Sequence, residues 1–223
     1  MPHDLIIYDC DGTLIDTETI YADINLKAYH AIGLTHWTLE AYVDAFVGIP
    51  VAEGRKVLEK EYGGPLPPDF EAEIEREAQR RIHTGIQTLP GVREAVGAVE
   101  GPRSVASSTS LQPLRRNLTT AGLIDLFDPY IFSASQVSRG KPHPDVFLYA
   151  AEQMGMAPER CLVIEDSVPG VLAARAAGMP VVGFTGVSHD VQRTKGRLME
   201  AGAFAVIAHM DEWPAMVRML RAG

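Results

Sequence analysis

The sequence has little cysteine, no excess of positive charge and no long hydrophobic run. Only two cysteines occur among 223 residues, and both Cys10 and Cys161 lie in apolar stretches typical of buried strands. We therefore expect two reduced, buried thiols rather than a structural disulfide. The formal net charge of −9 argues against nucleic acid or an anionic membrane surface as the main partner.

Long apolar segments are also missing. No segment approaches the roughly 18 uninterrupted apolar residues of a transmembrane helix. The first residues, from Met1 to Asp4, carry no basic region followed by an apolar run, so no signal peptide is predicted. These absences predict a soluble, cytoplasmic protein without a membrane partner, and a monomer is the default expectation. The 46% of hydrophobic residues suffice for one large or two modest domains.

From Pro90 onward, helical patterns that end in glycine alternate with short apolar runs. Gly155 and Gly178 each close such a pattern, and the apolar runs 161–164 and 180–184 follow them. Glycine suits the left-handed position that ends a helix, and apolar runs without alternation suit parallel strands buried on both faces. The pattern predicts an α/β fold, with a parallel sheet flanked by helices that binds ligands at its carboxyl edge.

The segment between the first apolar run, residues 5–8, and Pro90 breaks this rhythm. It contains four helical patterns and no convincing buried strand. A helical insert of this size, placed after the first strand, can fold as a cap over the strand ends. We therefore predict a discontinuous α/β core of residues 1–15 and 90–223, with a helical cap of residues 16–89. The four helices are expected over residues 17–32, 39–46, 51–62 and 69–84.

Two pairs of acidic residues follow predicted strands. Asp9 and Asp11 come directly after the first apolar run. Glu165 and Asp166 end the apolar run that begins at Cys161. If both strands lie centrally in a parallel sheet, the four groups meet at one edge, where a hard divalent cation such as Mg²⁺ offsets their repulsion. Either pair alone fits loop acids or helix N-caps better, but both pairs together favour a metal site.

The spacing of Asp9 and Asp11 allows both to address one substrate. Residues i and i+2 of an extended chain point to the same side. One carboxylate can then act as a nucleophile toward phosphorus, and the other as general acid and base. Gly12 lets the chain turn sharply and approach a ligand closely.

Two further polar features are candidates for phosphate binding. Ser107 and Ser108 follow the predicted strand 103–106, where a hydroxyl and the N–H groups of the next helix start can hold a phosphate oxygen. Lys141, between Gly140 and a proline, can stabilise phosphate charge as a point cation. Taken alone, each is better explained as an N-cap run or a solvated loop lysine.

In this order, the four pieces resemble the haloacid dehalogenase-like superfamily of phosphohydrolases over essentially the whole chain. The pieces are DCDGT from Asp9, the hydroxyl of Ser107, the lysine of GKPHPD and the EDSVPG that begins at Glu165. The resemblance implies a Rossmann-like parallel sheet with an inserted helical cap. The branch with such a cap contains β-phosphoglucomutase, phosphoglycolate phosphatase and many bacterial sugar phosphatases.

The resemblance also implies a role for each candidate residue. Asp9 is expected to attack phosphorus and carry the phosphoryl group. Asp11 is expected to protonate the leaving alcohol and then activate water. The transferring phosphoryl group is expected to bind to Ser107, Ser108 and Lys141.

The cofactor that the resemblance implies is Mg²⁺, as a template that stabilises charge. Its expected ligands are the Asp9 carboxylate, the Asp11 main-chain carbonyl and Asp166. Glu165 is expected to help directly or through a metal-bound water.

Three reactions compete within such a family. They are hydrolysis of a sugar or sugar-acid phosphate, phosphomutation of the β-phosphoglucomutase kind, and dehalogenation of a 2-haloacid. Dehalogenases of this superfamily lack the second aspartate, present here as Asp11. The mutases carry a cap histidine where Tyr21 stands and a cap arginine where Val51 stands, although Arg55 lies one helical turn further and can substitute. These departures favour a phosphoric monoester hydrolase and leave the mutase open; a binding protein without turnover is a further alternative.

The last predicted cap helix carries Arg76 and Arg80, which share a face because they are four residues apart. Exposed ion pairs on a solvated helix are the ordinary explanation. The sharper hypothesis is that one of them contacts a second anionic group of the substrate. Together with Tyr21, Val51 and Arg55, they form the set predicted to select the substrate.

Overall fold

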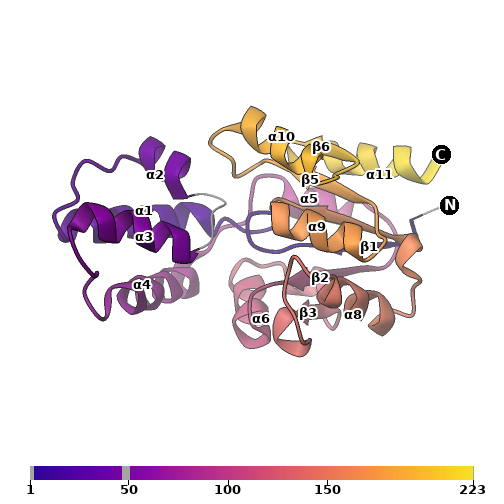
Figure 1. Ribbon diagram of the computed structural model, residues 1–223. Coiled ribbons are helices and arrows are strands. Elements are labelled where there is room, and N and C mark those ends of the chain that lie inside the picture. Colours follow the sequence, from indigo (N-terminus) through magenta and orange to yellow (C-terminus); the bar gives the residue numbers. More distant parts are fainter. Residues whose placement is uncertain (1–2, 47–50, 223) are drawn as a thin grey trace. The chain divides into compact units, whose positions relative to one another are not determined.

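The chain divides into two compact units, each with its own hydrophobic core. The sheet unit comprises Met1–Asp16 and Ile86–Gly223, and the helical unit comprises Thr17–Gly85. The computed structural model describes residues 3–46 and 51–222, without the side chains of residues 44, 51 and 52 (Figure 1). The units divide at residues 16 and 86, near the boundaries that the sequence predicts.

The sheet unit is built on six parallel strands in the order β3-β2-β1-β4-β5-β6. The chain fills the sheet from β1 to β3 on one side and from β4 to β6 on the other. A ligand crevice forms at such a reversal, here between β1 and β4, in open α/β sheets. The predicted parallel α/β architecture is confirmed. The strands are β1 (Leu5–Tyr8), β2 (Arg103–Ser107), β3 (Ile131–Ser133), β4 (Cys161–Glu165), β5 (Val181–Phe184) and β6 (Ala205–Ile207).

Helices cover both faces of this sheet (Figure 1). They alternate with the strands along the chain, as expected for right-handed crossovers. The α-helices are α5 (Val92–Gly97), α6 (Leu111–Thr120), α7 (Ile124–Phe127), α8 (Asp145–Gln153), α9 (Val168–Ala176), α10 (Val191–Glu200) and α11 (Trp213–Ala222). Three short 3₁₀ helices are η1 (Ala134–Gln136), η2 (Pro158–Arg160) and η3 (Met210–Glu212).

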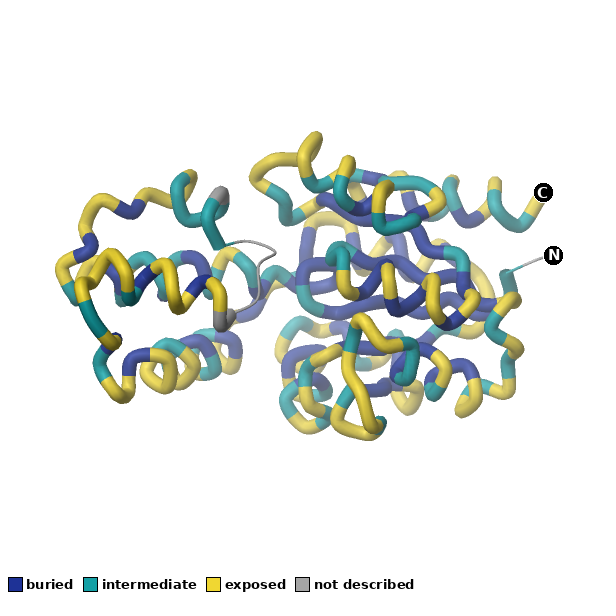
Figure 2. The backbone as a smooth tube through the Cα atoms, viewed as in Figure 1, coloured by how far each residue is buried: buried dark blue, intermediate teal, exposed yellow. Residues whose placement is uncertain are grey.

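The side chains of β1 alternate between the two faces of the sheet. Leu5 and Ile7 belong to a buried cluster that includes residues of α8, α9 and α10. Tyr8 points to the opposite face, with its ring 5.5 Å from Phe127 and 6.0 Å from Trp213. Its hydroxyl accepts a hydrogen bond from Trp213 Nε1 at 2.9 Å. Burial on both faces explains why β1 reads as an unbroken apolar run (Figure 2).

The two connections to the helical unit leave the sheet unit side by side. Ile15 forms an antiparallel bridge with Thr88. The Asp16 N–H donates to the Gln87 carbonyl at 3.1 Å. These backbone contacts hold the start and the end of the insertion together.

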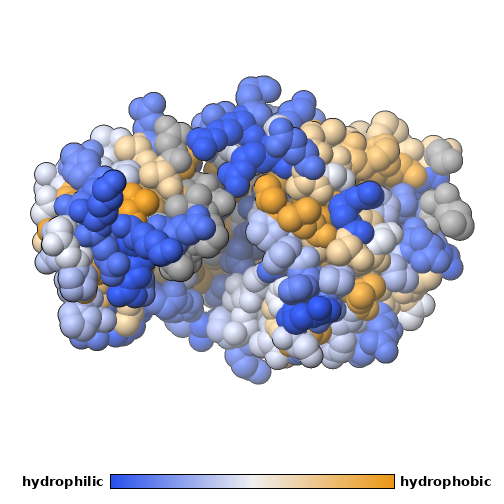
Figure 3. All heavy atoms as spheres, in the orientation of Figure 1, coloured by the Kyte–Doolittle hydropathy of each residue, from blue (hydrophilic) through white to orange (hydrophobic). Residues whose placement is uncertain are grey.

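The helical unit consists of four helices and contains no strand among its described residues, 17–46 and 51–85. Its buried core combines aromatic side chains with leucines: the Tyr29 ring lies 6.2 Å from Phe70 in a stacked arrangement and 6.4 Å from Trp37 edge-on. Its charged side chains lie on the outside (Figure 3). The helices are α1 (Glu18–Ala31), α2 (Leu39–Phe46), α3 (Val51–Tyr62) and α4 (Phe70–Gly85).

Two further expectations concern the cysteines and the lack of a membrane-spanning segment. Cys10 and Cys161 are both free and buried, as predicted. Within residues 3–46 and 51–222, no helix combines the length and the apolar character needed to cross a membrane.

Candidate active site

Asp9 and Glu165 lie side by side at the carboxyl edge of the sheet. β1 and β4 pair in register, with Tyr8 opposite Ile164, so the residues that follow come to the same level. The Asp9 N–H donates to the Ile164 carbonyl at 3.0 Å. Both acids are buried, with 6% of Asp9 and 1% of Glu165 exposed. Two buried carboxylates require a positive partner.

Lys141 is that partner. Its Nζ donates to Asp9 Oδ1 at 2.5 Å, to Glu165 Oε1 at 2.6 Å and to the Ala106 carbonyl at 3.1 Å. These bonds account for all three hydrogens of the ammonium group. The side chain is only 4% exposed, and Nζ lies 4.8 Å from the centre of the Phe147 ring. Lys141 is therefore a buried counter-ion and not a solvated loop lysine.

The pKa values of the pair reflect this burial. Burial raises the pKa of the Asp9 carboxyl to about 8; Lys141 opposes the shift, while the carboxylates of Glu165 and Asp11 add to it. Burial alone would lower the pKa of Lys141, but the charges of Asp9 and Glu165 outweigh it and raise that pKa. One ammonium group thus lies among several carboxylates, so the site carries an excess of negative charge that a further cation can offset.

The acidic group fits a divalent metal ion. Asp9, Glu165 and Asp166 each offer an oxygen, and these oxygens lie within 4.8 Å of one another. Gly12 makes this approach possible: its φ is +79°, and a Cβ there would lie 2.2 Å from Asp166 Oδ2. Carboxylate oxygens are the ligand type that Mg²⁺ prefers.

Glu165 has a different role from its two acidic neighbours. Its Oε1 accepts from Lys141, and its Oε2 accepts from both the N–H and the hydroxyl of Ser167 at 2.9 Å. The Gly170 backbone closes over it, since a Cβ there would lie 1.7 Å from Glu165 Oε1. Both oxygens of Glu165 therefore accept hydrogen bonds from protein groups, and Glu165 holds the Lys141 ammonium in place.

The Asp11 carboxylate turns to β2 instead. Its Oδ2 accepts from the Thr109 hydroxyl at 2.7 Å and from the Ser107 hydroxyl at 3.2 Å. Among the described side chains, it is not part of the acidic group around Asp9. Ser107 is buried and Ser108 is exposed. Sequence reasoning missed Thr109, although the hydroxyl run SSTS after the strand contained the signal.

The five residues predicted to select the substrate belong to the helical unit, and the four with described side chains contact its acidic residues. The Tyr21 hydroxyl donates to Glu75 Oε2 at 2.9 Å. Arg55 donates to Glu59 at 2.9 Å and to Glu71 at 3.1 Å. These contacts neutralise Arg55 within its own unit. The side chain of the fifth member of the set, Val51, lies outside the described residues.

Arg76 and Arg80 form exposed ion pairs on a solvated helix. Arg76 lies 3.9 Å from Glu73, and Arg80 lies 2.6 Å from Glu77, both on α4. The two guanidinium side chains are 66% and 64% exposed. Their contact with a substrate stays a prediction.

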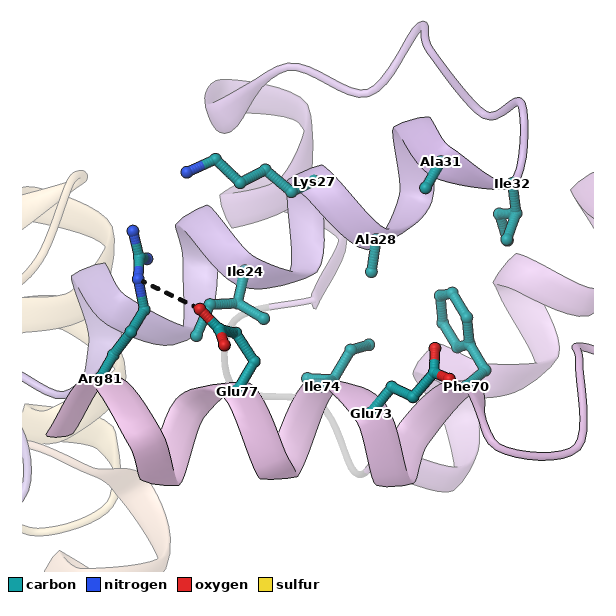
Figure 4. Close-up of a pocket in the computed structure, with 10 residues that line it drawn as sticks. All are labelled: Ile24, Lys27, Ala28, Ala31, Ile32, Phe70, Glu73, Ile74, Glu77 and Arg81. Carbon is teal, nitrogen blue, oxygen red and sulfur yellow. Dashed lines mark ion pairs between the residues drawn. The ribbon is translucent and has the colours of Figure 1, made fainter. Parts of the chain in front are cut away.

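A pocket of about 320 Å³ lies between α1 and α4 (Figure 4). Its floor is apolar and its rim is charged. At the rim, Arg81 lies 3.8 Å from Glu77 and also pairs with Asp23 at 2.5 Å, so these charges satisfy one another. Of the residues predicted to select the substrate, none with a described side chain lines it. The lining residues are Ile24, Lys27, Ala28, Ala31, Ile32, Phe70, Glu73, Ile74, Glu77 and Arg81.

Comparison with known proteins agrees with the fold and the site. The chain is an enzyme, a phosphoric monoester hydrolase. It belongs to the haloacid dehalogenase-like hydrolase family, whose model matches residues 3–178. The predicted family is thus confirmed, and the alternative of a binding protein without turnover is set aside.

Individual relatives resemble the chain over nearly its whole length. It is 32% identical over 207 residues to a phosphorylated carbohydrates phosphatase of Thermotoga maritima, covering 91% of this chain and 93% of the relative. A conserved haloacid dehalogenase-like protein of unknown function from Agrobacterium tumefaciens superposes with a TM-score of 0.90 at 37% identity, covering 97% and 98% of the two chains. A family hydrolase of Deinococcus radiodurans, solved with phosphate and sodium, gives 0.86 at 31% identity, covering 98% and 96%.

Proposed function

We propose that the chain is a Mg²⁺-dependent phosphatase that hydrolyses a small phosphorylated sugar or sugar acid through an aspartyl-phosphate on Asp9. The observation that carries this proposal is the buried ion pair between Lys141 and Asp9, braced by Glu165. It supports Asp9 as the nucleophile because the pair orients one carboxylate oxygen and leaves the other without a lysine contact. The carbohydrate class rests on the relative from Thermotoga maritima, whose name states that specificity.

The proposed reaction has two steps. In the first, an Asp9 oxygen attacks phosphorus and the bond from phosphorus to the substrate oxygen breaks. The electron pair of that bond stays on the alcohol oxygen, which takes a proton from Asp11. In the second, water attacks the phosphoryl group and gives a proton to Asp11, while the bond from phosphorus to Asp9 breaks and phosphate leaves.

The remaining groups hold charge and geometry during these steps. Lys141 keeps Asp9 oriented and places a positive charge beside the transferring group. The Ser107 hydroxyl and N–H groups at the start of α6 are proposed to bind phosphoryl oxygens when substrate is present. Asp9 and Asp166 would hold Mg²⁺, with the Asp11 main-chain carbonyl as the third predicted ligand. When bound, the ion supplies charge stabilisation and a template for the phosphoryl oxygens.

A panel of phosphorylated metabolites tests this function, assayed for both phosphate release and isomer formation, with and without Mg²⁺. We expect Mg²⁺-dependent phosphate release from at least one sugar or sugar-acid phosphate and no isomer. Isomer formation without net phosphate release would establish the mutase instead. Folded protein that hydrolyses none of the panel, not even an aryl phosphate, would contradict the proposal.

We propose that the helical unit acts as the predicted cap and provides the substrate selectivity. A cytoplasmic location and a monomeric state are proposed on the sequence alone. Size-exclusion chromatography with light scattering tests the second of these: a mass of twice the chain would contradict it.

A further inference from the structure

Thr109 makes a contact that neither the nucleophile nor the metal site requires. Its hydroxyl donates to Asp11 Oδ2 at 2.7 Å, the shorter of the two hydrogen bonds that this carboxylate oxygen accepts. Hydrogen bonds to a carboxylate are stronger than those between neutral groups. In the part of the chain that the structure describes, the Thr109 hydroxyl has no other hydrogen-bond partner.

The backbone around this contact is held from three sides. The Thr109 N–H donates to Ser107 Oγ at 3.0 Å, and its carbonyl accepts from the Ser133 hydroxyl at 2.6 Å. Ser133 is fully buried at the end of β3. On the other side, the backbone of Asp11 forms a bridge with Ile15. The hydroxyl and the carboxylate are therefore presented to each other by fixed backbones.

The second hydroxyl that donates to Asp11, that of Ser107, cannot donate to Asp11 and to a phosphoryl oxygen at the same time. Ser107 has a single O–H donor, which here points to Asp11 Oδ2 at 3.2 Å. If that proton turns to a phosphoryl oxygen when substrate binds, Ser107 no longer holds Asp11. Thr109 then remains as the donor to Oδ2.

We propose that Thr109 is the positioning residue of Asp11: its hydroxyl holds Oδ2 throughout the reaction, so that Oδ1 carries the proton given to the leaving alcohol. This inference rests on the proposed acid and base role of Asp11. A carboxyl oxygen that accepts a hydrogen bond from a fixed hydroxyl is the acceptor oxygen in both protonation states, which leaves the proton to the other oxygen. Thr109 thus defines which oxygen faces the substrate and at what angle.

The test uses the leaving group, because acid catalysis matters more for an alkoxide than for a stable phenolate. We compare kcat/KM for a sugar phosphate that the enzyme hydrolyses and for p-nitrophenyl phosphate, in saturating Mg²⁺. For Thr109→Val, we expect a loss of at least about tenfold for the sugar phosphate and less than about threefold for the aryl phosphate, since general acid catalysis contributes 10²- to 10⁴-fold. Thr109→Ser, which keeps the hydroxyl, should retain both activities within about threefold.

Two further variants complete the design. Thr119→Val removes an exposed hydroxyl on α6 that, among the described residues, donates to the Arg115 carbonyl alone, and it should change neither activity. Asp11→Asn should show the same preference for the aryl substrate in stronger form. Thr109→Ala repeats the test if Thr109→Val does not fold, as judged by circular dichroism.

The outcomes separate this inference from the proposed function. If Asp11→Asn discriminates between the substrates and the folded Thr109 variants do not, Thr109 does not position the acid, while the proposed mechanism stands. Equal losses on both substrates, without rescue by serine, also overturn the inference. If Asp11→Asn itself shows no discrimination, the assigned role of Asp11 fails and the inference falls with it.

Discussion

The two units of this protein differ in one kind of charge: the sheet unit holds a buried charged set in addition to exposed ion pairs such as that of Arg93 with Asp125, whereas the ion pairs among the described residues of the helical unit are all partly or largely exposed. In the sheet unit, the side chains of Lys141, Asp9 and Glu165 are 4%, 8% and 1% exposed. In the helical unit, the ion-paired arginines of α4 at positions 76 and 80 are about two-thirds exposed, and exposed residues are the most frequent class in α3 and α4 (Figure 2). A buried charge is tolerated only with a partner in good geometry, whereas water stabilises an exposed one. The buried set is therefore the part whose arrangement the fold must maintain.

The largest effect that this comparison predicts is on turnover. Asp9→Asn removes the nucleophilic oxygen from the buried set, and we expect a loss of phosphatase activity on the order of 10⁴-fold or more, with the fold intact. Asp125→Asn, an exposed acid paired with Arg93, is the matched control and should keep activity within about twofold. Initial rates with p-nitrophenyl phosphate and a circular dichroism spectrum check both. Substantial residual activity in folded Asp9→Asn would refute Asp9 as the nucleophile.

The second effect concerns the metal ion. A chelator should abolish activity, and added Mg²⁺ should restore it. Asp166→Asn removes a proposed ligand and should raise the Mg²⁺ concentration for half-maximal activity by at least about tenfold. The Mg²⁺-induced rise in Tm of the wild-type protein provides a readout without substrate, and the variant should show less of it. Full activity after exhaustive chelation would rule out the metal dependence.

The third effect is on stability. Lys141→Met leaves Asp9 and Glu165 buried without their counter-ion, and in metal-free buffer we expect a loss of about 3 to 5 kcal/mol in the free energy of unfolding. Arg139→Met, which removes an exposed guanidinium that pairs with Asp145, is the control and should change Tm only slightly. Urea unfolding measures both. Equal small changes in the two variants would mean that the buried ion pair is no more important for stability than an exposed one.

The smallest effect is expected in the helical unit. Arg80→Ala breaks its ion pair with Glu77, yet Tm should change by no more than about 1 °C because the pair is exposed. KM for an acidic sugar phosphate should also stay within about twofold, in line with the ordinary explanation. A rise in KM of fivefold or more, with kcat unchanged, would instead support the hypothesis that this arginine contacts the substrate.

The sequence predicted the strand-end acids and their lysine because these features are local. Asp9 and Glu165 each follow an apolar run, and such runs are read directly as buried strands. Lys141 could be placed only through its motif, since its partners lie 132 and 24 residues away along the chain. The hydrogen bond between Thr109 and Asp11 spans 98 residues, so the local hydroxyl run SSTS marks Thr109 as a candidate but does not reveal Asp11 as its partner.

The helical unit was harder to interpret for a related reason. The contact of Arg55 with Glu59 follows from helical spacing, but its contact with Glu71 depends on how α3 and α4 pack. The same holds for Tyr21, whose hydroxyl bonds to Glu75 of another helix. Where side chains are exposed, neither burial nor periodicity restricts their partners, so the sequence shows which charged residues are present but not which side chains they contact.

By itself, the sequence determined the class of protein: a parallel sheet whose strands end in carboxylates, and motifs that resemble those of the haloacid dehalogenase-like hydrolases. Only the tertiary structure decided how the groups divide the work. The register of β1 with β4 places Asp9 beside Glu165, and Lys141 forms an ion pair with each of them. The ends of β2 and β1 place Thr109 on Asp11. These pairings depend on strand register and on the need of each buried charge for an oppositely charged partner. Both connect segments that are far apart in the chain.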